Sequence, residues 1–83
     1  MAKKQKNRDT YRYKLKKGNE IVYIGITDDP KRRESEHKSE GKKFAKMEKV
    51  GPAVTRESAF KWESESINKY KKGHSGKSPK YND

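Results

Sequence analysis

Ile21-Val22-Tyr23-Ile24-Gly25-Ile26 is the stretch that decides the fold, because it is a continuous apolar and aromatic run. Such a run is typical of a central strand that is covered on both sides. The stretch before it, Thr10 to Leu15, alternates between apolar and charged residues, which predicts a half-buried strand with Tyr11, Tyr13 and Leu15 on one face. The sequence Lys17-Gly18-Asn19 is typical of a turn. The two strands therefore form a predicted hairpin.

Two helices are expected after the hairpin. Asp28-Asp29-Pro30 is a typical helix start, and the helix that follows, Pro30 to Ser39, has almost no apolar residues. A helix this polar should be exposed or should face a ligand. Thr55 caps a second helix over about Arg56 to Lys72, and we expect Trp62 to belong to the core. The apolar residues of this helix have roughly the spacing of one helical face: Ala59, Phe60, Trp62, Ile67 and Tyr70.

The remaining segments complete the predicted fold. Phe44 to Val50 is a candidate third strand, and Gly73 to Asp83 is expected to be a polar tail. Strand, strand, helix, strand, helix predicts a small α+β domain, with a three-stranded antiparallel sheet flanked by helices. Met1 to Asp9 is rich in lysine and almost without apolar residues, which favours a disordered basic arm. We therefore expect a single domain over residues 10–83.

Composition limits the classes of protein and partner. Of the 83 residues only 27% are hydrophobic, so the core must be small, and the absence of cysteine excludes disulfides and Cys-based zinc sites. No apolar stretch has the length of a membrane span or of a signal-peptide core, so we expect a cytoplasmic protein. The formal net charge of +11 favours a polyanionic partner. An anionic membrane surface is disfavoured, because no segment pairs its basic residues with a strong apolar face.

A few residues have the chemistry that phosphodiester cleavage requires. Arg33 and His37 are four residues apart, so both side chains lie on one face of their helix. Arginine keeps its charge and its planar fork fits phosphate oxygens. Tyr23, near the end of the strand that precedes this helix, can reach the same cleft. Glu63 is a candidate Mg²⁺ ligand, since Mg²⁺ needs only one or two protein carboxylates. Taken singly, each residue is more often a solvated or packed side chain, and only their joint spacing departs from chance.

In order and spacing these residues resemble the catalytic set of the GIY-YIG nuclease superfamily. Tyr23-Ile24-Gly25 matches the second half of the family name, and Arg33 and His37 match the family's essential arginine and the histidine that follows it. Ala59 to Glu63 is similar to the helical segment that ends in the family's metal-binding glutamate. Pro79-Lys80-Tyr81-Asn82 looks like the closing segment of the excision-repair incision nucleases, whose asparagine lies near the active site.

The resemblance departs from the family at the first strand, which has no Gly-Ile-Tyr. The first family tyrosine is either Tyr13, ten residues before Tyr23, or Tyr11, twelve residues before it. Tyr13 is slightly favoured because it gives the shorter hairpin. Both would face the same side of the strand, so the choice stays open at this point.

The resemblance implies a small stand-alone endonuclease domain, similar to the N-terminal nuclease domain of excision-repair and intron-homing endonucleases, that cuts DNA with Mg²⁺ or Mn²⁺. Tyr23, with Tyr11 or Tyr13, would position or activate the water, and Arg33 would stabilise phosphoryl charge. Glu63 would hold the metal, His37 would relay a proton or contact phosphate, and Asn82 would fix the geometry of the site. Basic residues near this helix are the expected nucleic-acid contacts: Lys31, Arg32, Lys42 and Lys43.

Other functions stay open. The same fold can bind nucleic acid with cleavage slow or lost, or the charge can serve only the solubility of an interaction protein. The joint presence of Tyr23, Arg33, His37 and Glu63 favours a nuclease over a binder, because a binder needs no isolated metal-binding carboxylate. A chain of 83 residues has no room for a DNA-reading domain, so we expect structure-selective or non-specific cutting by a monomer, unless a protein partner supplies specificity. RNA is a second possible substrate.

Gly73 to Ser78 superficially resembles a phosphate-binding P-loop. The motif requires another glycine where this chain has Lys71, and it requires a strand before the loop, where this chain has a predicted helix. We therefore do not expect a P-loop nucleotide site, and His74 is expected to be a surface loop residue.

Overall fold

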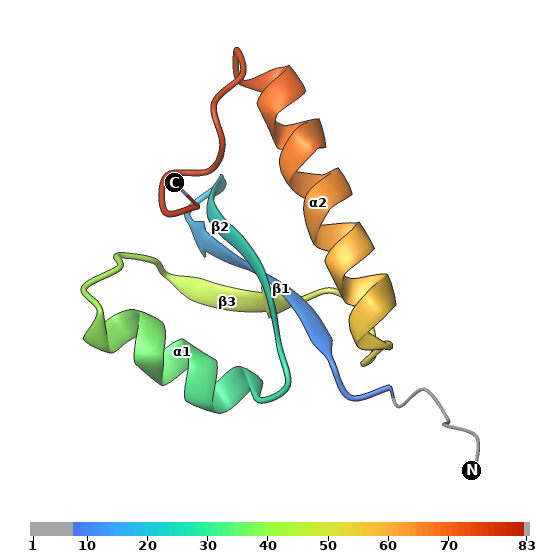
Figure 1. Cartoon of the computed structure of the whole chain (residues 1–83). Helices are drawn as coiled ribbons and strands as arrows, with labels where there is room; N and C mark the ends of the chain where they lie inside the picture. The colour runs from blue at the N-terminus through green and yellow to red at the C-terminus, as the bar shows by residue number, and fades with distance from the viewer. Residues whose placement is uncertain (1–7, 83) are drawn as a thin grey trace, which may run out of the picture.

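The computed structural model describes residues 8–82, so the predicted basic arm lies almost wholly outside the described residues. The protein has an α+β fold in which a three-stranded antiparallel sheet, in the order β2-β1-β3, is combined with two helices. The elements in chain order are β1 (Tyr11–Lys17), β2 (Glu20–Thr27), α1 (Pro30–Ser39), β3 (Lys46–Lys49) and α2 (Arg56–Gly73). The expected fold class and order of elements are confirmed (Figure 1).

The prediction that residues 21–26 form the central strand is wrong, because β1 pairs with both β2 and β3 and β2 lies at the edge. The apolar character of β2 has another cause. Its outer edge is covered by the C-terminal segment, where the Tyr81 backbone N–H donates to the Val22 carbonyl at 2.8 Å. Asn82 continues this contact, since its side-chain amide accepts from the Ile24 N–H at 2.8 Å and donates to the Ile24 carbonyl at 2.9 Å.

The same contacts correct the expectation of a polar tail after α2. Pro79 is fully buried, and Figure 1 shows the chain turning back from the end of α2 to lie beside β2. We name residues 79–82 the C-terminal strap. The strap is part of the folded domain, because it supplies hydrogen bonds that a second neighbouring strand would otherwise give to β2.

The hairpin forms in the predicted place, with a turn at Gly18 (φ 66°), and β1 runs on to Lys17. The third strand is shorter than expected, because Phe44 lies before it and packs against the core. The main core cluster consists of Tyr13, Leu15 and Val22, with Phe44 and Met47 packed against it.

Both helices begin where the sequence predicts. The side chain of Asp29 accepts from the Arg32 N–H, and the side chain of Thr55 accepts from the Ser58 N–H. α1 is polar as expected, except that His37 is fully buried. In Figure 1 α1 and α2 lie on opposite sides of β2. None of the helices in the described part of the chain is long and apolar enough to cross a membrane.

α2 packs on β2 and β1 through a face centred on Ala59, which is fully buried. The assignment of Phe60 to this face is wrong: Phe60 is 52% exposed, because consecutive helical residues point about 100° apart. Trp62 and Ile67 are half-buried, so Trp62 belongs only to the margin of the core. Glu63 lies four residues after Ala59 and shares its face, which explains why a carboxylate here is half-buried.

Candidate active site

Four of the expected residues meet on the face of the sheet that α1 covers. Tyr13 comes from β1, Tyr23 from β2, and Arg33 and His37 from α1. The Tyr13 hydroxyl is hydrogen bonded to Nε2 of His37 at 2.7 Å, and the rings of Tyr23 and His37 are 4.7 Å apart between centroids. We name Tyr13, Tyr23, Arg33 and His37 the tyrosine–histidine cluster. Residues far apart in sequence are thus brought together by three different elements.

Gly25 makes this arrangement possible. It is the cross-strand partner of Tyr13 in the β1–β2 register. A Cβ atom at Gly25 would lie 2.8 Å from the Tyr13 hydroxyl oxygen and 2.6 Å from Cε2 of Tyr23. Both distances are shorter than van der Waals contact. The glycine of the Tyr-Ile-Gly sequence is therefore required by the packing of the two tyrosine rings against the strand.

Of the two candidate first tyrosines, Tyr13 is the one in the cluster. It is fully buried, and its ring centroid is 6.0 Å from that of Tyr23. Tyr11 lies on the same face of β1 but two residues before Tyr13, opposite Thr27. There the Tyr11 ring contacts the ammonium group of Lys49, 5.8 Å from the ring centroid. The geometry therefore favours Tyr13 and leaves Tyr11 outside the cluster.

His37 is neutral at physiological pH. Burial, and then the charges of Arg33 and Lys42, lower its pKa to about 4, against smaller opposing effects of Glu40 and Glu36. Its Nδ1 atom is buried and has no hydrogen-bond partner within residues 8–82, since the nearest carboxylate oxygen, on Glu40, is 3.8 Å away. The ring is fully buried. A charged phosphate contact, one of the two roles expected for His37, is therefore disfavoured.

The Tyr13 hydroxyl is also neutral. Burial raises its pKa, the neighbouring Tyr23 adds to this effect, and the charge of Arg33 opposes it. A neutral phenol and a neutral imidazole thus share one short hydrogen bond in a water-poor environment. When the Tyr13 hydroxyl donates to Nε2 of His37, the lone pairs of its oxygen stay free to accept a hydrogen bond from a water molecule.

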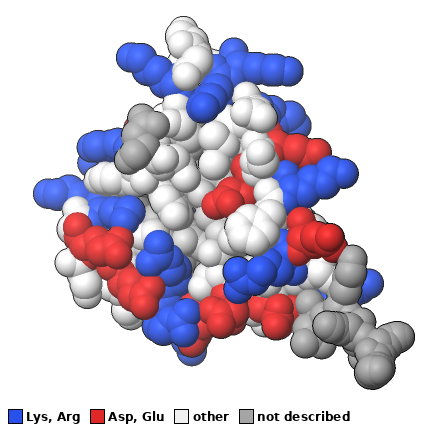
Figure 2. All heavy atoms as spheres, in the orientation of Figure 1, with Lys and Arg blue, Asp and Glu red and all other residues white. Residues whose placement is uncertain are grey.

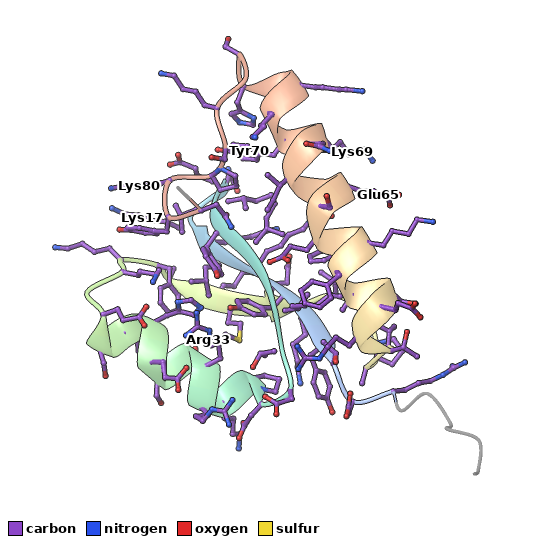
Figure 3. All side chains as sticks on the ribbon, in the orientation of Figure 1. Lys17, Arg33, Glu65, Lys69, Tyr70 and Lys80 are labelled. Atoms are coloured by element: carbon purple, nitrogen blue, oxygen red, sulfur yellow. The ribbon has the colours of Figure 1, made fainter. Side chains whose placement is uncertain are left out.

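Arg33 is the cationic member of the cluster. Burial acts to lower its pKa, but hydrogen bonds to Glu36, Tyr23 and Tyr13 raise it further above its usual range. The guanidinium lies 2.9 Å from Glu36 and 3.9 Å from Glu40. Figure 3 shows Arg33 on the side of α1 that faces the strands. It therefore links the tyrosine hydroxyls to two carboxylates that sequence reasoning did not single out.

The four basic residues expected to contact nucleic acid differ in exposure and in their ion pairs. Lys31, Arg32 and Lys43 are exposed, and Arg32 pairs with Asp28 at 3.0 Å. The side chain of Lys42 is only 16% exposed and forms an ion pair with Glu40. Its ammonium group is 5.7 Å from the ring centroid of Tyr23. Lys42 therefore belongs to the border of the cluster rather than to an open basic surface.

Glu63 stands apart from the other expected residues. It makes no hydrogen bond or ion pair with any described residue, and burial raises the pKa of its carboxyl group. α2, which holds it, lies across β2 from α1 (Figure 1). Among the described residues no group of three or more His, Cys, Asp or Glu side chains is placed to hold a metal. A lone, unpaired carboxylate still fits Mg²⁺, which keeps most of its water ligands.

Asn82 is joined to the cluster through the backbone. Its amide holds both polar backbone groups of Ile24, the residue after Tyr23. The neighbouring Tyr81 accepts from the Lys43 N–H at 3.0 Å, so the C-terminal strap also contacts the loop after α1. Asn82 therefore holds the backbone next to Tyr23, and its role in the site stays a prediction.

The surface around the cluster is mixed in charge. On the face shown in Figure 2, uncharged side chains form most of the centre, and Lys and Arg side chains lie around its margin with acidic ones between them. No protein-family model, curated protein or solved structure matches this chain. The resemblance to GIY-YIG nucleases therefore stands on the residues and contacts described above.

Proposed function

We propose that this protein is a divalent-metal-dependent endonuclease of the GIY-YIG type that hydrolyses phosphodiester bonds in DNA, with structure-selective or non-specific cutting. The observation that carries the proposal is the convergence of Tyr13, Tyr23, Arg33 and His37, with Tyr13 and His37 hydrogen bonded at 2.7 Å. Two phenol groups, a permanent cation and a neutral imidazole on one side of a small sheet are the groups that phosphoryl chemistry needs. The net charge of +11 supports a polyanionic substrate.

The proposed role of each residue is supported by its contacts. Arg33 exchanges Glu36 for non-bridging phosphate oxygens and stabilises the charge that develops on them. The Tyr13 hydroxyl donates its hydrogen bond to Nε2 of the neutral His37, so that the lone pairs of the Tyr13 oxygen can accept a hydrogen bond from the attacking water and hold that water in line. Tyr23 stands beside both, with its ring 4.7 Å from that of His37, and positions the same water or the phosphate.

Glu63 is the residue that would hold Mg²⁺ or Mn²⁺, and the metal would supply Lewis-acid stabilisation of phosphoryl charge. Its carboxylate has no competing cation among residues 8–82. Burial raises its pKa because the charge is uncompensated, so a cation beside it would be favourable.

A second function is favoured by two specific observations. Glu63 has no contact with the cluster, and Arg33 is already paired with Glu36 and Glu40. Both features suit a nucleic-acid-binding module in which cleavage is slow or lost. RNA then stands beside DNA as a ligand, because phosphate contacts alone do not distinguish the two.

The test is a panel of labelled duplex, flap, single-stranded and RNA substrates, incubated with Mg²⁺, Mn²⁺ or EDTA. The nuclease proposal expects cleavage with metal, none with EDTA, and none with Glu63→Gln, whose affinity for DNA should be unchanged or slightly higher. Glu65→Gln, an exposed carboxylate on the same helix, is the matched control and should cut normally. Binding without cleavage on every substrate would favour the binding module, and cleavage that survives both EDTA and Glu63→Gln would remove the metal mechanism.

A further inference from the structure

A pocket outside the tyrosine–histidine cluster opens at the C-terminal end of α2. It has a volume of about 480 Å³, within the range of pockets that hold small ligands. Its walls come from the last turns of α2, the loop that follows, and the first residue of β2. The side chains that define it are Glu20, Tyr70, His74, Lys77, Ser78 and Lys80. None of these residues belongs to the expected active site.

One wall of the pocket is a pair of stacked rings. Tyr70 and His74 are one helical turn apart, with ring centroids 3.7 Å apart and planes inclined by only 3°. Nδ1 of His74 lies 2.8 Å from the Tyr70 carbonyl, and since a carbonyl only accepts, Nδ1 donates. This hydrogen bond fixes the His74 ring while His74 stays exposed. A fixed, exposed aromatic surface is what an unpaired nucleic-acid base stacks on.

The other charged lining residues of the pocket are mostly basic. Lys77 and Lys80 line it together with a single acidic residue, Glu20. Neither lysine forms an ion pair with any residue in the range 8–82, although the Lys80 ammonium group lies 5.3 Å from the ring centroid of Tyr81. No described carboxylate therefore competes with a ligand for either charge. Figure 3 labels Tyr70 and Lys80 in this region, on the side of the molecule away from α1. Lysine binds phosphate as a point charge, without the geometric demands of arginine.

We propose that this pocket binds an unpaired nucleotide of a DNA or RNA strand, with its base on the Tyr70–His74 stack and its phosphate against Lys77 and Lys80. The mode differs from the P-loop that the sequence excludes, because it uses lysine side chains and a ring stack instead of a cradle of backbone N–H groups. The proposal rests on the proposed function in one respect, namely that the bound nucleotide belongs to the substrate strand of the nuclease.

The position of the pocket gives the spacing between the two sites. Glu20 in the pocket and Tyr23 in the cluster are three residues apart on β2, which is about 10 Å along a strand. The C-terminal strap joins them, because Lys80 lines the pocket and Asn82 binds Ile24 beside Tyr23. The pocket and the cluster are therefore connected through β2 and the C-terminal strap.

The test measures binding without cleavage. Fluorescein-labelled oligo(dT) and oligo(U) of twelve nucleotides are titrated in EDTA, at several salt concentrations, and read by fluorescence anisotropy. The double variant Lys77→Gln/Lys80→Gln is compared with Lys38→Gln/Lys61→Gln, which removes the same charge from exposed positions on α1 and α2. Circular dichroism checks the fold of each.

The double variant Lys77→Gln/Lys80→Gln should weaken binding by roughly tenfold or more. It should reduce the salt slope by about 0.7, since the two lysines hold one phosphate and each phosphate contact of a single strand contributes about 0.7. The control pair should change the affinity much less. Equal losses in the two pairs would overturn the proposal, because only the bulk charge would then matter.

Separate variants test whether a base stacks on the Tyr70–His74 pair. His74→Ala should weaken binding to the single strands by roughly fivefold or more and leave blunt duplex binding unchanged, whereas His74→Phe should keep most of the affinity. An unchanged affinity of His74→Ala for single strands would overturn the proposed stacking. All these measurements are made without metal, so their outcome is independent of the cleavage test. A protein that cuts no substrate can still bind an unpaired nucleotide in the pocket, and an active nuclease can still fail to bind one there.

Discussion

Arg33 and Arg32 are neighbours on α1 with different surroundings. The Arg33 side chain is 29% exposed and interacts with both tyrosines of the cluster, whereas that of Arg32 is 54% exposed and pairs with Asp28. Lysine keeps the charge but loses the planar fork that holds two phosphate oxygens. Arg33→Lys should therefore lower the single-turnover cleavage rate by roughly a hundredfold or more, with little change in DNA affinity.

Arg32→Lys is the control for this prediction. It should have a mild effect on both rate and affinity, because its contacts are on the exposed side of the helix. Small and equal effects of the two substitutions would mean that α1 is only a basic surface.

His37 should make stability depend on pH. Its pKa is lowered from 6.5 to about 4 in the folded protein, so the unfolded chain binds the proton more readily. Stability is therefore complete above about pH 6.5 and is lost as the pH falls toward 4, by about 3 kcal/mol in all. Denaturant titrations at pH 7, 6 and 5 measure the slope before most carboxylates titrate.

His37→Gln keeps a polar partner for Tyr13 without a titrating ring, and it should remove most of the slope between pH 7 and 5. A slope that is the same in this variant would assign the pH dependence to other groups.

Gly25 tests the packing of the two tyrosines. Gly25→Ala places a Cβ within 2.8 Å of the Tyr13 hydroxyl and should cost about 1–3 kcal/mol of stability, with displacement of both rings. Near-ultraviolet circular dichroism and denaturation report the two effects. Gly73→Ala is the matched control, because nothing lies within 4 Å of its Cβ position, and it should be neutral or slightly stabilising.

At the scale of the elements, β2 is held from both edges. β1 pairs with its inner edge, and the C-terminal strap supplies the hydrogen bonds of its outer edge. Asn82 makes the last of these contacts. Its side-chain amide donates to and accepts from the backbone of Ile24, as the backbone of a neighbouring strand would. Tyr23 therefore owes its position partly to a residue almost sixty positions later in the chain.

Asn82→Ala should cost about 1–2 kcal/mol of stability, because two hydrogen bonds to Ile24 are lost. It should also speed hydrogen exchange at the Ile24 amide in NMR spectra. Asn68→Ala, an exposed asparagine on α2, should change neither. Unchanged exchange at Ile24 in Asn82→Ala would show that the strap does not hold the edge of β2.

At the scale of the whole molecule, the proposed binding to nucleic acid should depend on charge. With a net charge of +11, binding to duplex DNA should weaken steeply with salt, each phosphate contact contributing about −0.9 to the slope of log K against log salt. Deleting residues 1–8 should weaken binding without unfolding the domain, because Thr10, the next paired residue, keeps its backbone hydrogen bonds to Val54. An affinity that does not change with salt would contradict a nucleic-acid ligand.

Local patterns in the sequence were sufficient for most of the fold. The caps at Asp29 and Thr55, the turn at Gly18 and the alternation of β1 act over a few residues, so each can be recognised without the rest of the chain. The spacing of Arg33 and His37 on one helical face is of the same kind. For that reason the element order and three of the four cluster residues were predictable.

Contacts between distant segments were decided only by the tertiary structure. The apolar run of β2 predicted a covered strand but not what covers it, because a strap from residues 79–82 and a neighbouring strand leave the same pattern. The choice between Tyr11 and Tyr13 required the register that puts Tyr13 over Gly25. The burial and low pKa of His37, and the pocket at the end of α2, arise from packing between elements, and burial is a property of the folded chain that no local pattern carries.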